Sequence, residues 1–467
     1  MAKSNLSLDN DYLSWLKSQS MVLSTKEKEI RTKEIKKLVK KDLDVQLKMD
    51  VKENTLFHKY HELKEWLPKQ KESDLRWVER LIWKPMGKSD FRRIEPELIF
   101  VDGHYEIDSI NIWGESQTDI YESADPLAKH WEILRRLVSR ARYDRFPART
   151  LNFLVRDKVS KTYLGVISIT SDMLDLTERN KTIGADIGKF SKDGFAFNIT
   201  VNGQTIVPTQ PFGSAYLGGK LLALLCLSDV VSNTWKQIYG ETIVGVTTTS
   251  LYGDTGKDGR TQYDGLTPYW KNVGQSKGSA PVKMTDFVYE QVAEWIRLCY
   301  PEQYYRDAVK LNSHNNAPKD SKNKLQRFAY KQLGLDSGSV SLHKRNIYFS
   351  RLYKNTDEYI KKYIDNKYDS TIQTLPVERL EKAFDNSVEK LTEHWRYGYA
   401  TDTTTSPKHL VKKYGQNIRR LVKGRVDEKF KNQRIPTKGI QVEWYEKLGN
   451  FKNWELAKKE YQNSNED

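Results

Sequence analysis

The sequence predicts an α+β protein in which a mixed β-sheet core is flanked by helical regions at both ends of the chain. Three observations predict this class. In residues 151–278, strand-like runs alternate with a glycine-containing turn and an apolar helix. Before about residue 90 and after about residue 360, charged residues and a sparse apolar stripe follow helical spacing. Finally, 38% apolar residues, with 26 Tyr and 12 Trp, are enough to pack a core.

The core pattern predicts three strands, at residues 151–157, 163–170 and 242–249. A glycine-containing turn at 210–220 leads directly into an apolar helix at 221–231. Strand, glycine turn, helix and strand is the order in which a mixed sheet builds a ligand cleft. We therefore expect the functional site within this block.

At 467 residues the chain is too long for one ordinary core. We expect a charged helical N-terminal region at 1–90, an α/β core region at 91–360 and a basic helical C-terminal region at 361–467. Asp102-Gly103, between two alternating segments, predicts a β-hairpin near the start of the core region. Residues 341–356 interleave basic and aromatic side chains, which suits either contact with nucleic acid or a half-buried edge strand.

The formal charge of +15 and the pI of about 9.3 favour a polyanionic partner, because Lys and Arg that neutralise phosphates release counterions. A soluble protein that is merely rich in Lys is the alternative.

The two cysteines, Cys226 and Cys299, cannot form a disulfide framework or a zinc cluster, so we expect a reducing compartment. The N-terminus lacks an apolar signal core, and the longest apolar run, near Leu221, is too short to cross a bilayer. These features predict a cytoplasmic protein without a membrane partner.

Several segments between residues 135 and 356 follow one another in a distinctive order. They are an Arg-rich approach to Leu-x-Phe-Leu-Val-x-Asp at 151–157, Leu-Gly-x-Ile-Ser at 164–168, Ile183-Gly184, Trp235 before Tyr239-Gly240, a run with Gly, Tyr and Trp-x-x-x-Gly at 261–274, and the closing segment 345–356. In this order they resemble the DruA family, which occurs in a bacterial anti-phage defence system, near mobile elements and in phages. The resemblance implies a role in phage–bacterium conflict, with DNA and with other defence or phage proteins as partners.

The order of elements also resembles the acetyltransferase-type (GNAT) fold, a wider group that includes the DNA-modifying Mom protein of a transposing phage. In that fold the pyrophosphate of acyl-CoA sits on backbone amides at the start of a central helix. The resemblance implies an acyl-CoA-type donor and assigns its binding to Gly213, Ser214, Gly218, Gly219 and Lys220. The spacing of the glycines from 213 to 219 departs from the usual Arg/Gln-x-x-Gly-x-Gly/Ala signature. A tight turn that caps a core helix therefore remains the alternative.

Three residues are candidates for catalysis: Asp172, Tyr252 and Tyr263. Asp172 follows the second strand, where it could act as a general base or hold a substrate amine. It could equally cap the next helix. The tyrosines could stack a flipped or single-stranded base, or simply pack in the core. We predict no metal site, because Asp264 and its acidic neighbours in the preceding loop read as a solvated turn.

We predict one basic patch that binds nucleic acid. Each guanidinium group can donate two parallel hydrogen bonds to the oxygens of one phosphate. The members of the patch are Arg136, Arg140, Arg142, Arg145, Lys344 and Arg345. Two functions fit these features. The first is a DNA-associated transferase, related to acyltransferases, that modifies a base. The second is a non-catalytic DNA-binding or scaffold subunit of a defence, phage or mobile-element assembly. The sequence leaves open whether the protein is an enzyme.

Overall fold

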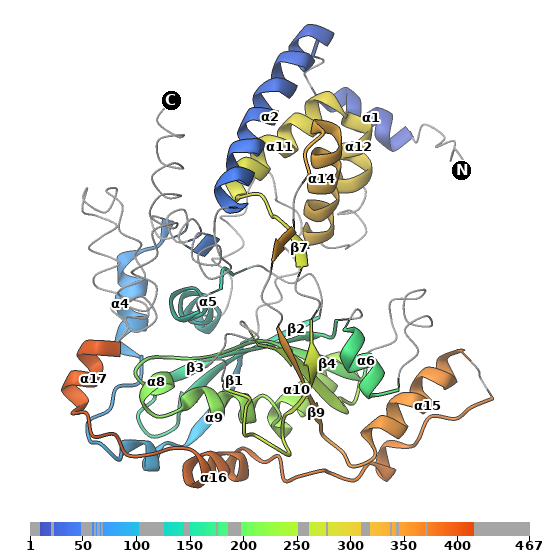
Figure 1. Cartoon of the computed structure of the whole chain (residues 1–467). Helices are drawn as coiled ribbons and strands as arrows, with labels where there is room; N and C mark the ends of the chain where they lie inside the picture. The colour runs from blue at the N-terminus through green and yellow to red at the C-terminus, as the bar shows by residue number, and fades with distance from the viewer. Residues whose placement is uncertain are drawn as a thin grey trace.

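A computed structural model describes residues 10–19, 23–47, 58–59, 62, 66, 69–101, 126–139, 141–143, 149–173, 176–184, 198–250, 261–276, 279–309, 318–336, 339–341, 345–368 and 371–414. A seven-stranded sheet with helices on both faces lies at one end of the molecule, and a helical lobe lies at the other (Figure 1). The strands of the sheet are β1 (Pro96–Val101), β2 (Thr150–Asp157), β3 (Tyr163–Ser171), β4 (Thr200–Pro208), β5 (Gly245–Thr249), β6 (Lys271–Gln275) and β9 (Asn346–Arg351).

The strand order is β1-β2-β3-β4-β5-β9-β6. Neighbouring strands are antiparallel except β4 and β5, which are parallel. The predicted α+β class with a mixed sheet is therefore confirmed. Two strand predictions need correction: β4 was not expected at all, and β9 lies between β5 and β6 rather than at an edge. The predicted hairpin around Asp102 lies outside the described residues.

Helices cover both faces of the sheet (Figure 1). On one face, α4 (Glu72–Arg80) and α5 (Pro126–Val138) pack on the strands through Leu134, Leu154 and Val166. The helices associated with the other face are α8 (Phe212–Ala215), α9 (Gly218–Leu225), α10 (Asp229–Tyr239), α16 (Val388–Gly398) and α17 (Pro407–Tyr414). The apolar helix predicted at 221–231 is in fact two helices, because the extended backbone of Ser228 ends the first and begins α10.

The helical lobe is joined to the sheet by a β-ribbon made of two antiparallel strand pairs. The β6–β9 pairing is followed by a second antiparallel pair, β7 (Ser279–Pro281) with β8 (Ser339–Ser341). The lobe comprises α11 (Asp286–Cys299), α12 (Pro301–Tyr304), the π-helix η6 (Tyr305–Val309) and α14 (Pro318–Leu333), together with the N-terminal α1 (Asn10–Ser18) and α2 (Thr25–Leu47). Residues far apart in sequence thus share one core, in which Val39 of α2 packs with Trp295 of α11. The division into three regions stays a prediction.

The remaining helices are η2 (Asp90–Arg93), α6 (Thr177–Thr182), α15 (Thr356–Tyr368) and η7 (Val377–Arg379). Of these, α15 packs against β9 through Ile360 and Phe349. Within the described part of the chain, no helix combines the length and the apolar character that crossing a bilayer requires. Across the same residues, no three His, Cys, Asp or Glu side chains are grouped to hold a metal ion.

Candidate functional site

The candidate site lies where the two parallel strands separate. β4 and β5 are in register at only three positions, from Thr200 opposite Gly245 to Asn202 opposite Thr247. β4 then continues to Pro208, whereas β5 ends at Thr249. Backbone groups of β4 beyond Asn202 therefore have no partner in β5, and other groups must satisfy them.

Two side chains from residues 261–270 reach this separation. Gln262 donates from Nε2 to the carbonyl oxygen of Ile206 on β4, at 3.1 Å, and to the hydroxyl of Tyr263, at 3.0 Å. Thr248 of β5 donates to the carbonyl oxygen of Gly203, at 2.8 Å. The amide of Gln262 thus takes the place that a strand or a ligand amide would have on β4.

Tyr263 is buried behind Gln262. Its ring contacts Trp270 and Tyr348, with ring centroids 5.3 and 4.9 Å away. Burial raises the pKa of the Tyr263 phenol far above its usual range, so the hydroxyl stays protonated at neutral pH. In this arrangement the ring packs against the core rather than lying open to a base. Its predicted part in catalysis stays a prediction, and Tyr252 lies outside the described residues.

The glycine turn brings α8 and α9 close together. A Cβ atom on Gly218 would lie 2.4 Å from the Phe212 ring, and one on Gly219 would lie 2.7 Å from Oε1 of Gln262. Gly218 therefore requires glycine for close packing, whereas a side chain at position 219 would displace the end of the flexible Gln262 side chain. Neither amide donates a hydrogen bond to another described residue, as is usual for the first turn of a helix. The turn is thus compatible with both interpretations, helix packing and anion binding.

Lys220 lies beside these amides. Its ammonium group contacts the carbonyl oxygens of Asp264 and Gln262, and it lies 5.0 Å from the ring centroid of Tyr399. Among the described residues, its hydrogen bonds go to these carbonyl oxygens and not to a carboxylate. Burial lowers the pKa of Lys220, while the nearby Asp264 opposes this effect. The Asp264 carboxylate thus balances part of the Lys220 charge without forming an ion pair with it, and the direct contacts of the ammonium group are with carbonyl oxygens.

The turn also contains the usual acyl-CoA signature, beginning three residues before the glycines from 213 to 219. Gln210-Pro-Phe-Gly213-Ser-Ala215 fits the pattern Arg/Gln-x-x-Gly-x-Gly/Ala, and it begins two residues after β4 ends. The stated departure from that signature is therefore wrong. The Gln210 side chain accepts from the amide of Ser214, at 3.0 Å, and Ser214 itself is exposed.

Asp172, at the end of β3, lies in a buried ion pair. Its carboxylate accepts from Nη1 of Arg179, from Thr200 Oγ1 at 2.7 Å and from Thr247 Oγ1 at 2.8 Å. The side chains of Asp172 and Arg179 are both fully buried. The helix-capping alternative for Asp172 is wrong, because the N-cap of α6 is Leu176. A role as general base stays a prediction that would require this carboxylate to leave its four hydrogen-bond donors, the fourth being the Met173 amide.

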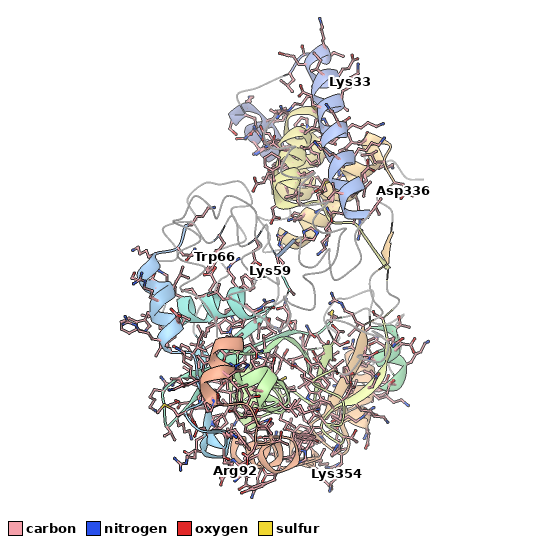
Figure 2. All side chains as sticks on the ribbon, turned by 60° about the vertical axis from the view of Figure 1, so that its left-hand side comes forward. Lys33, Lys59, Trp66, Arg92, Asp336 and Lys354 are labelled. Carbon is pink, nitrogen blue, oxygen red and sulfur yellow. The ribbon has the colours of Figure 1, made fainter. Side chains whose placement is uncertain are left out.

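Of the four predicted phosphate-binding arginines, the structure describes Arg136 and Arg142. Arg136 donates to Glu62 at 2.7 Å and to Glu132 at 3.0 Å, and it lies 5.2 Å from the ring centroid of Trp66. Although burial opposes it, these carboxylates raise the pKa of Arg136. Trp66 lies between the sheet and the helical lobe (Figure 2). Arg136 therefore connects α5 to Glu62 and Trp66 within the protein.

Arg142 is also engaged within the protein. It donates to Asp286 at the start of α11, at 2.8 Å, and Lys322 of α14 binds the same carboxylate at 2.7 Å. These contacts connect the sheet region to the helical lobe. Arg345 is exposed at the start of β9. Arg140, Arg145 and Lys344 lie outside the described residues, so the single patch stays a prediction.

Fold and site together define an α+β protein with one diverging parallel strand pair and an inserted helical lobe. Residues 129–362 of the 467 match the family model described as Druantia protein DruA, and this match covers half of the chain. The chain belongs to the DruA family. It is similar to the Druantia protein DruA of Escherichia coli (strain UMEA 4076-1), with 26% identity over 161 residues. That alignment covers 32% of this chain and 39% of the relative, so the similarity spans less than half of the relative's length. No solved structure matches the chain.

Proposed function

We infer that the chain is a DNA-associated cytoplasmic protein of phage–bacterium conflict, whose sheet is the GNAT-like core of a DNA-modifying transferase. Membership of the DruA family and the net charge of +15 support the biological setting and the polyanionic partner. Other proteins of a defence or phage assembly are its expected protein partners.

The separation of β4 from β5 is the observation that carries this proposal. After β4 the chain enters α8, where Gln210, Gly213 and Ala215 have the spacing Arg/Gln-x-x-Gly-x-Gly/Ala. Parallel strands that part expose backbone groups along one strand, and a helix N-terminus nearby favours an anion. An acyl-CoA would use the exposed backbone groups for its extended arm and the helix N-terminus for the pyrophosphate at the end of that arm.

The residues present fit an acyl-CoA-type donor. Such a donor would supply an acyl group as a thioester. The amides of Gly218 and Gly219 and the ammonium group of Lys220 would hold its anionic part. Because the Gln262 amide already donates to Ile206, donor binding along β4 would require this side chain to move.

A negative charge at the turn should weaken donor binding. Ser214→Asp should lower the affinity for acetyl-CoA at least about tenfold, since a unit charge a few ångströms from a partly buried anion costs more than about 1.4 kcal/mol. Ser214 is exposed, so folding should be preserved. Calorimetric titration measures the affinity, and Ser73→Asp, on an exposed position of α4, is the charge-matched control. Equal affinities for both variants would mean that the turn does not hold the donor.

Catalysis is tested by incubating the protein with DNA and acyl donors, followed by mass spectrometry of the nucleosides. A mass added to one nucleoside would support the transferase. Unaltered nucleosides with every donor, together with no donor binding, would refute it.

Arg345, which is exposed, and the three patch residues outside the described part of the chain should carry DNA affinity. Replacing Arg140, Arg145, Lys344 and Arg345 with Gln should weaken binding to all sequences, and each lost phosphate contact should flatten the log–log salt slope by about 0.9. Arg136 and Arg142 are left intact, because their charges are balanced by carboxylates inside the protein. The matched control replaces four exposed lysines of α2, namely Lys33, Lys36, Lys37 and Lys40. Lys33 lies on the outside of the helical lobe (Figure 2). If the control has the larger effect, DNA binds the lobe instead.

A non-catalytic DNA-binding or scaffold subunit is the second candidate function. The observation that favours it is the closure of the β4–β5 separation by Gln262 and Tyr263. Tyr263→Phe keeps the ring packing and removes only the hydroxyl. If this variant folds and binds DNA normally but loses biological activity against phage, the non-catalytic function is excluded.

A further inference from the structure

One face of the sheet changes from apolar to polar along its central strands. It is the face covered by α5, on the same side as the helical lobe (Figure 1). Beneath α5, Leu154 and Val166 face each other across β2 and β3 and are fully buried. Further along, the cross-strand register brings buried polar side chains together, each at most 6% exposed. This polar floor consists of Asn152, Ser168, Thr170, Asn202, Thr205 and Thr247.

A β-bulge in β4 creates part of the polar floor. Ser168 pairs with Thr205, but the next residue of β3 pairs with Gly203, so Gln204 is inserted. The insertion places Asn202 and Thr205 on the same face although they are three residues apart. Gln204 is exposed, whereas Gly203 and Thr205 on either side are buried. Solvent therefore reaches the middle of the sheet at the bulge, beside the separation of β4 from β5.

The hydrogen bonding of the polar floor is incomplete. Thr205 accepts from Nε of Arg135 on α5, at 3.0 Å, and Asn202 donates to Thr170 at 3.4 Å. The Oδ1 atom of Asn152 is buried and has no hydrogen-bond partner among the residues that the structure describes. An unsatisfied buried carbonyl oxygen is costly, and central strands are ordinarily apolar on both faces. A native protein that retains such a group calls for a specific reason.

The six side chains of the polar floor are neutral, and the neighbouring Asp172 is paired with Arg179. The guanidinium group of Arg135 is a cation at the margin of the floor, where it donates to Thr205 and to the carbonyl oxygen of Ala141. The floor therefore suits a polar ligand with several donors and acceptors at its edge. The Oδ1 atom of Asn152 requires a hydrogen-bond donor, which an N–H group at the edge of such a ligand would supply.

We propose that the polar floor binds the edge of an unpaired nucleobase carrying an exocyclic amine, which donates to Oδ1 of Asn152. A carboxamide and an amine-bearing base edge are complementary, because each offers a donor beside an acceptor. A base can reach a buried polar surface only when it is out of its duplex stack. The inference rests on the proposed association with DNA and names the part of the nucleic acid that the sheet would bind.

The test compares oligonucleotides and free nucleosides with the full chain. Wild-type protein should bind dA12 and dC12 at least about fivefold more tightly than dT12, since thymine lacks an exocyclic amine. Asn152→Leu should abolish this preference while retaining the salt-dependent affinity common to all three. Thr170→Val, a nearly isosteric change, should reduce the preference and serves if the first variant does not fold. Ser350→Ala is the matched control, because it removes another unpaired buried oxygen, in register with Val246 on the opposite face.

The outcomes separate this inference from the proposed function. If wild-type protein binds all three oligonucleotides equally, the polar floor does not bind a base, although DNA association stands. A raised melting temperature of Asn152→Leu with an unchanged base preference would overturn the inference in the same way. If no oligonucleotide binds, the proposed DNA association fails. Preference for deoxyadenosine and deoxycytidine over thymidine would then still support the polar floor, and equal or absent nucleoside binding would overturn it.

Discussion

Replacing Arg179 with Met should lower the free energy of unfolding by about 3–5 kcal/mol, because it leaves the carboxylate of Asp172 buried without its cation. Both side chains are fully buried in the structure. Burial lowers the pKa of Arg179, and the contact with Asp172 opposes that effect. Thr200 and Thr247 would still donate to Asp172, but neutral donors do not balance its charge. Urea unfolding at pH 7, followed by circular dichroism, measures the loss.

Two comparisons identify the cause of this loss. The double variant Asp172→Leu with Arg179→Met should recover much of the stability, since apolar residues often replace a buried ion pair without cost. Lys390→Met, which breaks an exposed pair with Glu393, should leave the midpoint of urea unfolding nearly unchanged. If Arg179→Met costs no more than Lys390→Met, the ion pair between Asp172 and Arg179 does not stabilise the fold.

The central strands β2 and β3 could be predicted because their apolar runs are bounded by turn residues. Strand β4 could not, since Asn202, Gln204 and Thr205 interrupt the apolar alternation that identifies a strand. The bulge shifts the alternation by one residue, so neither face has a regular pattern. The features that hid β4 in the sequence are those that form the polar floor. A strand carrying buried polar residues is easily mistaken for a loop.

The candidate site was predicted only in its local part. The turn from Gly213 to Lys220 and its position before a helix follow from neighbouring residues. The contact of Gln262 with Ile206 joins residues 56 apart and depends on how β4 and β5 separate, so no local sequence pattern predicts it. For the same reason, the sequence suggested phosphate binding for Arg136 and Arg142. Their partners Glu62 and Asp286 are 74 and 144 residues away.

The stability of the helical lobe should depend on pH through Asp42 of α2. This carboxylate accepts from the amide and the hydroxyl of Thr285, each at 3.1 Å, and from Gln46 at 2.9 Å. Burial raises the pKa of Asp42 from 3.8 to about 6, although these hydrogen bonds oppose the shift. Between pH 3.8 and about 6 the folded state therefore holds a proton that the unfolded state has lost. The stabilisation is fully present below pH 3.8 and is lost as the pH rises through about 6, a change of about 3 kcal/mol.

Hydrogen exchange of the α11 amides, corrected for the intrinsic pH dependence, measures this change at pH 4, 5, 6 and 7. The wild-type lobe should lose about 2.4 kcal/mol relative to Asp42→Asn over this range, because about 0.5 kcal/mol of the change has already occurred at pH 4 and the variant has no proton to release. Asp286 does not interfere. Although burial opposes it, Lys322 and Arg142 lower its pKa to about 2, so its stabilising effect is lost only as the pH falls below 3.8. A constant difference between wild type and variant would mean that Asp42 is ionised throughout. Its three hydrogen bonds would then outweigh the desolvation of the carboxylate where α2 docks onto α11.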